Sequence, residues 1–185
     1  EFEENGKIIY RPIARDRDQV FPKYDGFLLS LVMRIPALKH MQPFGEDIRN
    51  VKWFNMEPYP MDLAFTKNSS QEDWLAEANY IIENLTDEII DNSFQNLPQE
   101  VKDDNLEEIK KLLKVRKPKL KVYAEEYYKV LRKTVLLTGT DKDDKFIITR
   151  LPKGETKVQI YRLKKDGEKL YFEKNYSICS FKCIC

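Results

Sequence analysis

The residues best suited to chemistry by type and spacing form one short stretch, Arg15-Asp16-Arg17-Asp18-Gln19, directly after a strand-like run from Lys7 to Ile13. Side chains two residues apart in a strand share a face, so we expect Asp16 and Asp18 to project together, opposite Arg15 and Arg17. Two aligned carboxylates offer hard oxygen ligands for Mg²⁺ or Mn²⁺, which complete their shells with water and substrate phosphates. The alternative is a ladder of surface ion pairs, which contributes little to stability.

The composition of the chain is that of a folded protein. Hydrophobic residues make up 42% and aromatic residues 12% of its 185 residues, which suffices for one domain with a core or for a domain with a smaller lobe. The formal net charge of +1 argues against a dedicated nucleic-acid binder, so binding must come from local patches. Because no apolar run is long enough to cross a bilayer, the sequence predicts no transmembrane segment and a soluble chain. The missing initiator Met predicts a fragment of a larger protein.

The cysteines are confined to the end of the chain, at Cys179, Cys183 and Cys185. Their spacing has no paired Cys-x-x-Cys unit and no nearby His, so it is a poor match to a zinc site. We expect residues 177–185 to form a frayed tail.

Local signals predict an α+β fold. Asn5-Gly6 indicates the turn of an N-terminal β-hairpin whose second strand runs to Ile13. The run Phe27 to Met33 is apolar but too short to span a membrane, and residues 36–67, rich in Pro and aromatic residues, predict an irregular, packed connection.

Four helices are expected in the middle of the chain. The first follows a capping pair, Ser70 and Asp73, and should dock through Trp74. The second begins at Thr86 and is ended by Pro98. The third spans 106–116, and Pro118 separates it from a fourth helix that places Tyr123, Tyr127, Val130 and Leu131 on one side.

Beyond residue 134 the pattern changes to short β-prone runs at 135–138, 145–149, 156–161 and 169–172, separated by turn residues. The simplest assembly of these runs is a four-stranded antiparallel meander. The sequence therefore predicts three parts: residues 1–133 as an α+β unit, 134–176 as the meander and 177–185 as the tail.

Other charged clusters have simpler explanations. The lysines from Lys110 to Lys121 could bind phosphates or an anionic surface, but their alternation with leucines is typical of the solvated face of an amphipathic helix. Asp141, Asp143 and Asp144 lack the Gly and distal Glu of a calcium loop and predict a turn. His40 is the only histidine, so no two-histidine site is possible within this chain.

The segment from Asn5 to Phe21, NGKIIYRPIARDRDQVF, resembles the strand, Pro-Ile, acidic pair and Phe of CotH-like atypical kinases. The resemblance implies that Asp16 and Asp18 hold the Mg²⁺ or Mn²⁺ of bound ATP. Arg15 or Arg17 would then neutralise phosphate charge, and Gln19 and Asp25 would orient the metal's ligands.

Over nearly its whole length the chain is similar to the middle region of large bacterial envelope proteins. The similarity is carried by segments such as Arg15 to Gly26, Glu72-Asp73-Trp74, Leu97-Pro98, AEEYY at 124–128, Gly139 to Lys142 and Val158 to Gly167. Those proteins often combine a calcineurin-like metallophosphoesterase domain with an outer-membrane β-barrel. The resemblance implies a place in the cell envelope and makes other domains of the same parent chain the expected partners.

Two functions follow from these resemblances. The first is the C-terminal part of a kinase-like, metal-dependent phosphotransferase domain. This chain has neither the DRH-type segment that would supply the catalytic aspartate nor the phosphate-binding lysine lobe, so we assign no catalytic residue and expect no activity from it alone. The alternative is a noncatalytic scaffold or interaction module that links the phosphoesterase to the barrel.

Overall fold

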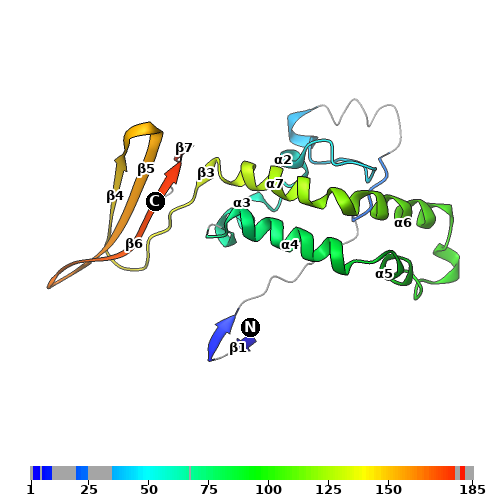
Figure 1. The fold of residues 1–185 in the computed structure, drawn as a ribbon, viewed down its shortest axis with the longest axis horizontal. Helices are drawn as coiled ribbons and strands as arrows, with labels where there is room; N and C mark the ends of the chain where they lie inside the picture. The colour runs from blue at the N-terminus through cyan, green and yellow to red at the C-terminus, as the bar shows by residue number, and fades with distance from the viewer. Residues whose placement is uncertain are drawn as a thin grey trace.

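The computed structural model describes residues 2–4, 6–9, 20–24, 35–66, 68–177 and 180–181, and across these ranges the chain is α+β, as predicted. Figure 1 shows a helical body and, beyond one end of it, a β-sheet. The segment after Leu131 leads from one to the other. No helix within these ranges combines the length and the apolarity that a membrane crossing requires.

The predicted N-terminal hairpin is present. Strands β1 (Phe2–Glu4) and β2 (Lys7–Ile9) pair in antiparallel register, with Glu4 opposite Lys7. Gly6 has φ +72°, the left-handed conformation that a two-residue hairpin turn requires and that glycine adopts without strain. The predicted continuation of β2 to Ile13 and the apolar run from Phe27 to Met33 lie outside the described residues.

The helical body contains six α-helices among the described residues: α2 (Val51–Phe54), α3 (Tyr59–Phe65), α4 (Gln71–Asn84), α5 (Asp87–Asn92), α6 (Asp104–Arg116) and α7 (Leu120–Leu131). The prediction of an irregular connection over residues 36–67 is wrong for α2 and α3. The Asn50 side chain caps α2 by accepting a hydrogen bond from the Trp53 N–H at 3.1 Å. Pro60 lies in the first turn of α3, where a missing N–H costs nothing.

Side-chain caps set the ends of the predicted helices. The capping box at the start of α4 is confirmed: Asp73 accepts from the Ser70 N–H at 2.7 Å, and Ser70 Oγ accepts from the Asp73 N–H at 3.2 Å. Helix α5 ends at Asn92, earlier than the predicted stop at Pro98, and there Ser93 Oγ donates to the Ile89 carbonyl. Pro118 falls in a 3₁₀ turn, Lys117–Lys119, and α6 and α7 follow nearly one line (Figure 1).

The core of the helical body lies where α4 and α7 run side by side in opposite directions (Figure 1). Its buried residues are Val51, Leu63, Tyr127 and Leu131. Trp74 docks α4 on α7, as expected, by an edge-to-face contact with Tyr127 at 5.7 Å between ring centroids. The Trp74 side chain is half-buried rather than fully buried.

The sheet is a three-stranded antiparallel meander of β4 (Asp144–Arg150), β5 (Glu155–Lys164) and β6 (Gly167–Ser177). The predicted fourth strand at 135–138 is wrong. Strand β3 (Thr134–Val135) instead pairs in parallel with β7 (Ser180–Phe181), within the predicted tail. The reason is packing: Val135 and Leu137 are buried in one cluster with Val158 and Ile160 of β5, so this segment contributes side chains to the core of the sheet and does not extend its edge.

Candidate functional site

The structure does not test the site predicted from the acidic stretch. All six of its residues lie outside the described part of the chain: Arg15, Asp16, Arg17, Asp18, Gln19 and Asp25. The three cysteines also lie outside it. Within the described ranges, no three His, Cys, Asp or Glu side chains gather closely enough to hold a metal ion. The Mg²⁺ or Mn²⁺ site therefore remains a prediction.

A different site is formed where the helical body meets the sheet. This junction groove has a volume of about 580 Å³ and lies between the α3–α4 loop, the end of α7 and the end of β6. Its lining residues are Asn68, Ser69, Ser70, Gln71, Tyr128, Lys129, Arg132, Lys133, Lys174, Asn175 and Tyr176. Four of these described residues are cationic and none is acidic, which gives the junction groove a positive character.

Arg132 holds one wall of the junction groove in place. Its guanidinium donates to the backbone carbonyls of Thr66, at 2.8 Å, and Ser69, at 2.7 Å, and stacks over the Tyr128 ring. The Trp74 indole N–H donates to Ser69 Oγ at 2.8 Å. These hydrogen bonds fasten the α3–α4 loop to α7, so the polar groups of the loop are preorganised.

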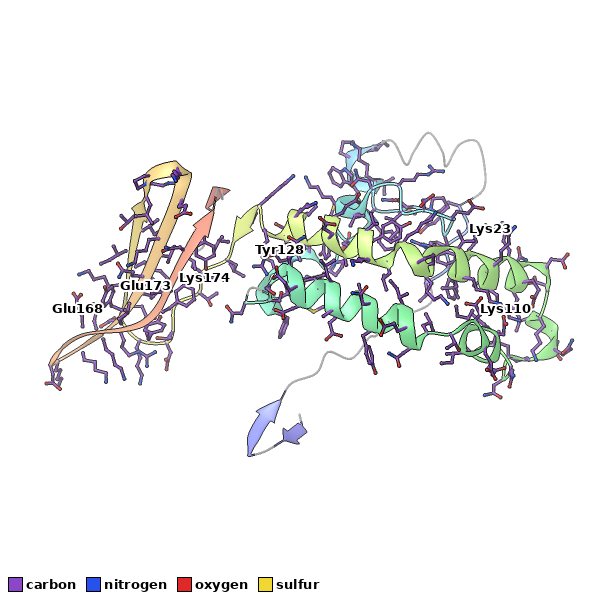
Figure 2. All side chains as sticks on the ribbon, in the orientation of Figure 1. Lys23, Lys110, Tyr128, Glu168, Glu173 and Lys174 are labelled. Atoms are coloured by element: carbon purple, nitrogen blue, oxygen red, sulfur yellow. The ribbon has the colours of Figure 1, made fainter. Side chains whose placement is uncertain are left out.

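Three lysines contribute the remaining positive charge. Lys129 pairs with Glu125 one turn earlier on α7, an exposed ion pair of small energetic value. The ammonium group of Lys174 lies 5.5 Å from the centre of the Tyr176 ring. Lys133 is exposed and forms no ion pair with another described residue. Figure 2 shows Tyr128 at the end of the helical body nearest the sheet and Lys174 on the sheet itself.

Simple periodicity explains why these side chains converge. Tyr128 and Lys129 lie in the last turn of α7, and Arg132 and Lys133 follow its final residue, each four positions later. Arg132, the C-cap, keeps a helical backbone conformation and therefore lies on the same side as Tyr128, over whose ring its guanidinium stacks. Lys174 and Tyr176 are two residues apart on β6 and share one face of the sheet. The spacing of lysines at the end of the fourth predicted helix was a usable signal. Their proximity to β6, about 40 residues later, depends on how the sheet folds back.

A smaller pocket of about 210 Å³ adjoins the junction groove and shares three of its lining residues, Asn68, Arg132 and Tyr176. Its other lining residues are largely apolar: Leu63, Thr134, Val135, Leu136, Leu137, Thr138, Ile160, Tyr171 and Phe172. We call it the apolar pocket. A positive groove therefore opens next to an apolar cavity.

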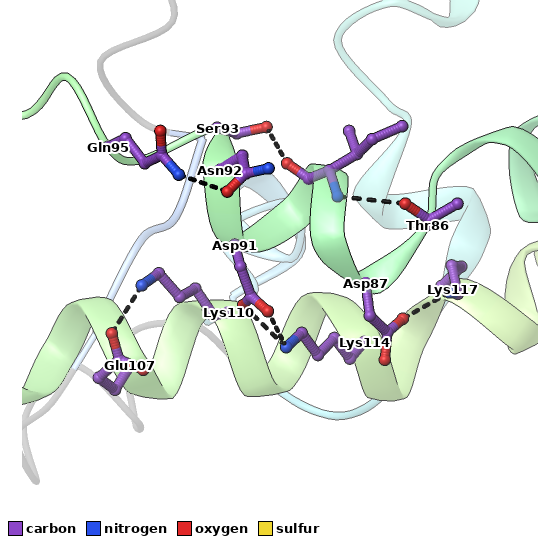
Figure 3. A network of polar contacts seen from close by, with 11 residues as sticks. Thr86, Asp87, Asp91, Asn92, Ser93, Gln95, Glu107, Lys110, Lys114 and Lys117 are labelled. Atoms are coloured by element: carbon purple, nitrogen blue, oxygen red, sulfur yellow. Dashed lines mark hydrogen bonds and ion pairs between the residues drawn. The ribbon is translucent and has the colours of Figure 1, made fainter.

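The lysines of α6 and the following turn have a structural role. Lys114 pairs with Asp91 at 2.8 Å and Lys117 with Asp87 at 2.7 Å, which ties α6 to α5 (Figure 3). The hydrogen bond from Lys117 is the main cause of a lowered pKa at Asp87. Lys119 similarly bridges to Asp47 at 2.7 Å. Acidic partners therefore neutralise much of this basic stretch.

Asp144 also stabilises the fold. Its carboxylate accepts hydrogen bonds from the backbone N–H and the hydroxyl of Thr140, and the backbone bond is the main cause of its lowered pKa. Arg162 donates to the same hydroxyl at 3.0 Å. These contacts order the loop before β4, in agreement with the predicted turn.

The comparisons with known proteins add no relative: no protein family matches the chain, and neither a curated protein nor a solved structure is similar to it.

Proposed function

We propose that this chain is a noncatalytic interaction module that binds an anionic segment of a partner protein in the junction groove. The observation that carries the proposal is the charge of the groove, with four cationic lining residues and no acidic one among those described. The wall fastened by Arg132 makes the site preorganised, which reduces the entropy lost on binding.

The expected interaction is of moderate strength and sensitive to salt. Lys129 and Lys133 are exposed, so each ion pair they form with a ligand should contribute about 0.2–1 kcal/mol. Because salt screens such pairs, affinity should fall as the ionic strength rises. The resemblance to envelope proteins makes another domain of the same parent chain, within the cell envelope, the expected source of the anionic segment.

Fluorescence anisotropy tests this proposal. A labelled peptide of ten glutamates should bind the chain at low ionic strength and dissociate as NaCl is added, whereas a peptide of ten glutamines should not bind. Equal binding of both peptides would contradict the proposed role of charge.

The second candidate function is that of a metal-dependent phosphotransferase domain. The spacing of Asp16 and Asp18 favours it, because two carboxylates on one face of a strand suit Mg²⁺ or Mn²⁺ bound with ATP. Its test is the effect of metal and nucleotide on thermal unfolding, which does not depend on the junction groove.

A further inference from the structure

We infer that the partner segment carries a large apolar side chain between its acidic residues, and that this side chain enters the apolar pocket. The inference rests on the proposed function, since it takes the junction groove as the site of the acidic residues. The two cavities share Asn68, Arg132 and Tyr176, so one short ligand can occupy both at once.

The size of the apolar pocket suits a single side chain. An apolar cavity of about 150 Å³ is large enough to bind benzene. At about 210 Å³, the apolar pocket can therefore accept a ring or a branched aliphatic group. Leu63, Val135 and Ile160 provide buried apolar surface among its lining residues.

The lining of the junction groove favours a peptide over a lipid. Asn68 and Asn175 offer exposed amide donors and acceptors along the groove, and a peptide backbone can pair with both. A long acyl chain would need an extended channel lined by aliphatic side chains, whereas the larger cavity is lined by polar and charged residues and two tyrosines. The occupant that fits both cavities is a short acidic peptide with one apolar anchor.

Three labelled peptides test the inference. The first has one phenylalanine flanked on each side by three glutamates, the second has alanine in place of phenylalanine, and the third keeps phenylalanine but has glutamines in place of glutamates. Burying the ring should make the first bind about tenfold more tightly than the second. The third should bind more weakly than the first because the lysines lose their partners.

A substitution at the shared wall supplies the second measurement. Asn68 is exposed and lines both cavities, so the larger side chain of Asn68→Trp should take up space at their shared wall. The affinities of the phenylalanine and alanine peptides should then differ by about twofold or less. Asn84→Trp, on an exposed site at the end of α4, is the matched control and should preserve the preference. Circular dichroism checks that both variants fold.

The outcomes separate the two proposals. If the phenylalanine and alanine peptides bind equally to the unaltered chain, the inference of an apolar anchor is wrong, whereas the proposal that the junction groove binds an anionic segment is unaffected. If the Asn68→Trp variant still binds the phenylalanine peptide more tightly than the alanine peptide, the inference that the anchor enters this pocket is also wrong. If no glutamate peptide binds at all, the proposed function itself fails.

Discussion

Leu136 and Leu137 are neighbours in the chain but pack into different hydrophobic cores. Leu136 packs against the helical cluster that contains Tyr127 and Leu131. Leu137 is buried with Val158 in the cluster of the sheet. A single peptide unit therefore bridges the two cores, and both leucines line the apolar pocket.

Truncating Leu137 should destabilise the chain strongly. Leu137→Ala removes a side chain that is only 7% exposed, so the free energy of unfolding should fall by about 2–5 kcal/mol. Leu136→Ala should cost less because Leu136 is only partly buried. Urea denaturation of the two variants measures the difference. The reverse order would contradict the assignment of Leu137 to the core of the sheet.

Trp74→Ala should cost less than a fully buried tryptophan would. The side chain is half-buried, so we expect a loss of about 2–3 kcal/mol from the lost contact with Tyr127 and the lost hydrogen bond to Ser69. Trp74→Phe keeps a ring but removes the donor, and should cost about 1 kcal/mol. Urea denaturation that gives equal losses for both variants would show that the hydrogen bond, and not the ring, provides the stabilisation.

Tyr127 should make the free energy of unfolding fall as the pH rises in the alkaline range. Burial first, and then the hydrogen bond from its hydroxyl to Asp62 at 2.7 Å, raise the pKa of Tyr127 above the usual value of about 10. Above that pH the unfolded chain releases this proton while the folded chain retains it, so the free energy of unfolding falls as pH rises, and below it this contribution is constant.

Tyr127→Phe isolates this effect. The variant loses the hydrogen bond to Asp62, so it should be less stable at pH 8 by about 1–3 kcal/mol. Between pH 8 and 11 the free energies of unfolding of the variant and the unaltered chain should become more similar. Only the unaltered chain has Tyr127, which ionises more readily when the chain is unfolded. Urea denaturation across this range provides the test, and a constant difference would contradict the raised pKa.

The predicted metal site has its own test, through ligand-dependent unfolding. At a ligand concentration about a hundred times Kd, Mg²⁺ or Mn²⁺ with ATP should stabilise the chain by about 2.7 kcal/mol. In a domain of this size, that corresponds to a rise of roughly 5–11 °C in Tm. Asp18→Asn should abolish the shift because it removes one of the two carboxylate ligands. A shift that persists in the variant would place the nucleotide elsewhere, and no shift in the unaltered chain would favour the ion-pair ladder.

Local rules predicted most of the elements of this fold. The capping box of Ser70 and Asp73, the turn at Asn5-Gly6 and the break at Pro118 depend on neighbouring residues, so the sequence reveals them. The run at 135–138 has the composition of a strand, but its side chains are divided between two cores. Whether this run joins the meander or packs into the two cores depends on residues that are distant in the sequence. A local sequence pattern does not identify those residues.

The junction groove could be predicted only in part. The spacing of Lys129 and Lys133 indicates one charged helix face, but Lys174 reaches the same groove from β6. That proximity depends on the path of the chain through Leu136 and Leu137 and on the register of β5 with β6. The predicted site at Asp16 and Asp18 lies outside the described residues, so it remains a prediction.

The most direct test of the proposed function compares two triple variants for binding the peptide of ten glutamates. Lys129→Gln, Lys133→Gln and Lys174→Gln together remove three charges from the junction groove, whereas Lys142→Gln, Lys164→Gln and Lys165→Gln remove three exposed charges elsewhere. At about 0.2–1 kcal/mol for each lost ion pair, we expect roughly a 3- to 150-fold loss of affinity in the first variant and less than about a twofold loss in the second. Equal losses in the two variants would show that the peptide responds to net charge alone and would contradict a binding site in the junction groove.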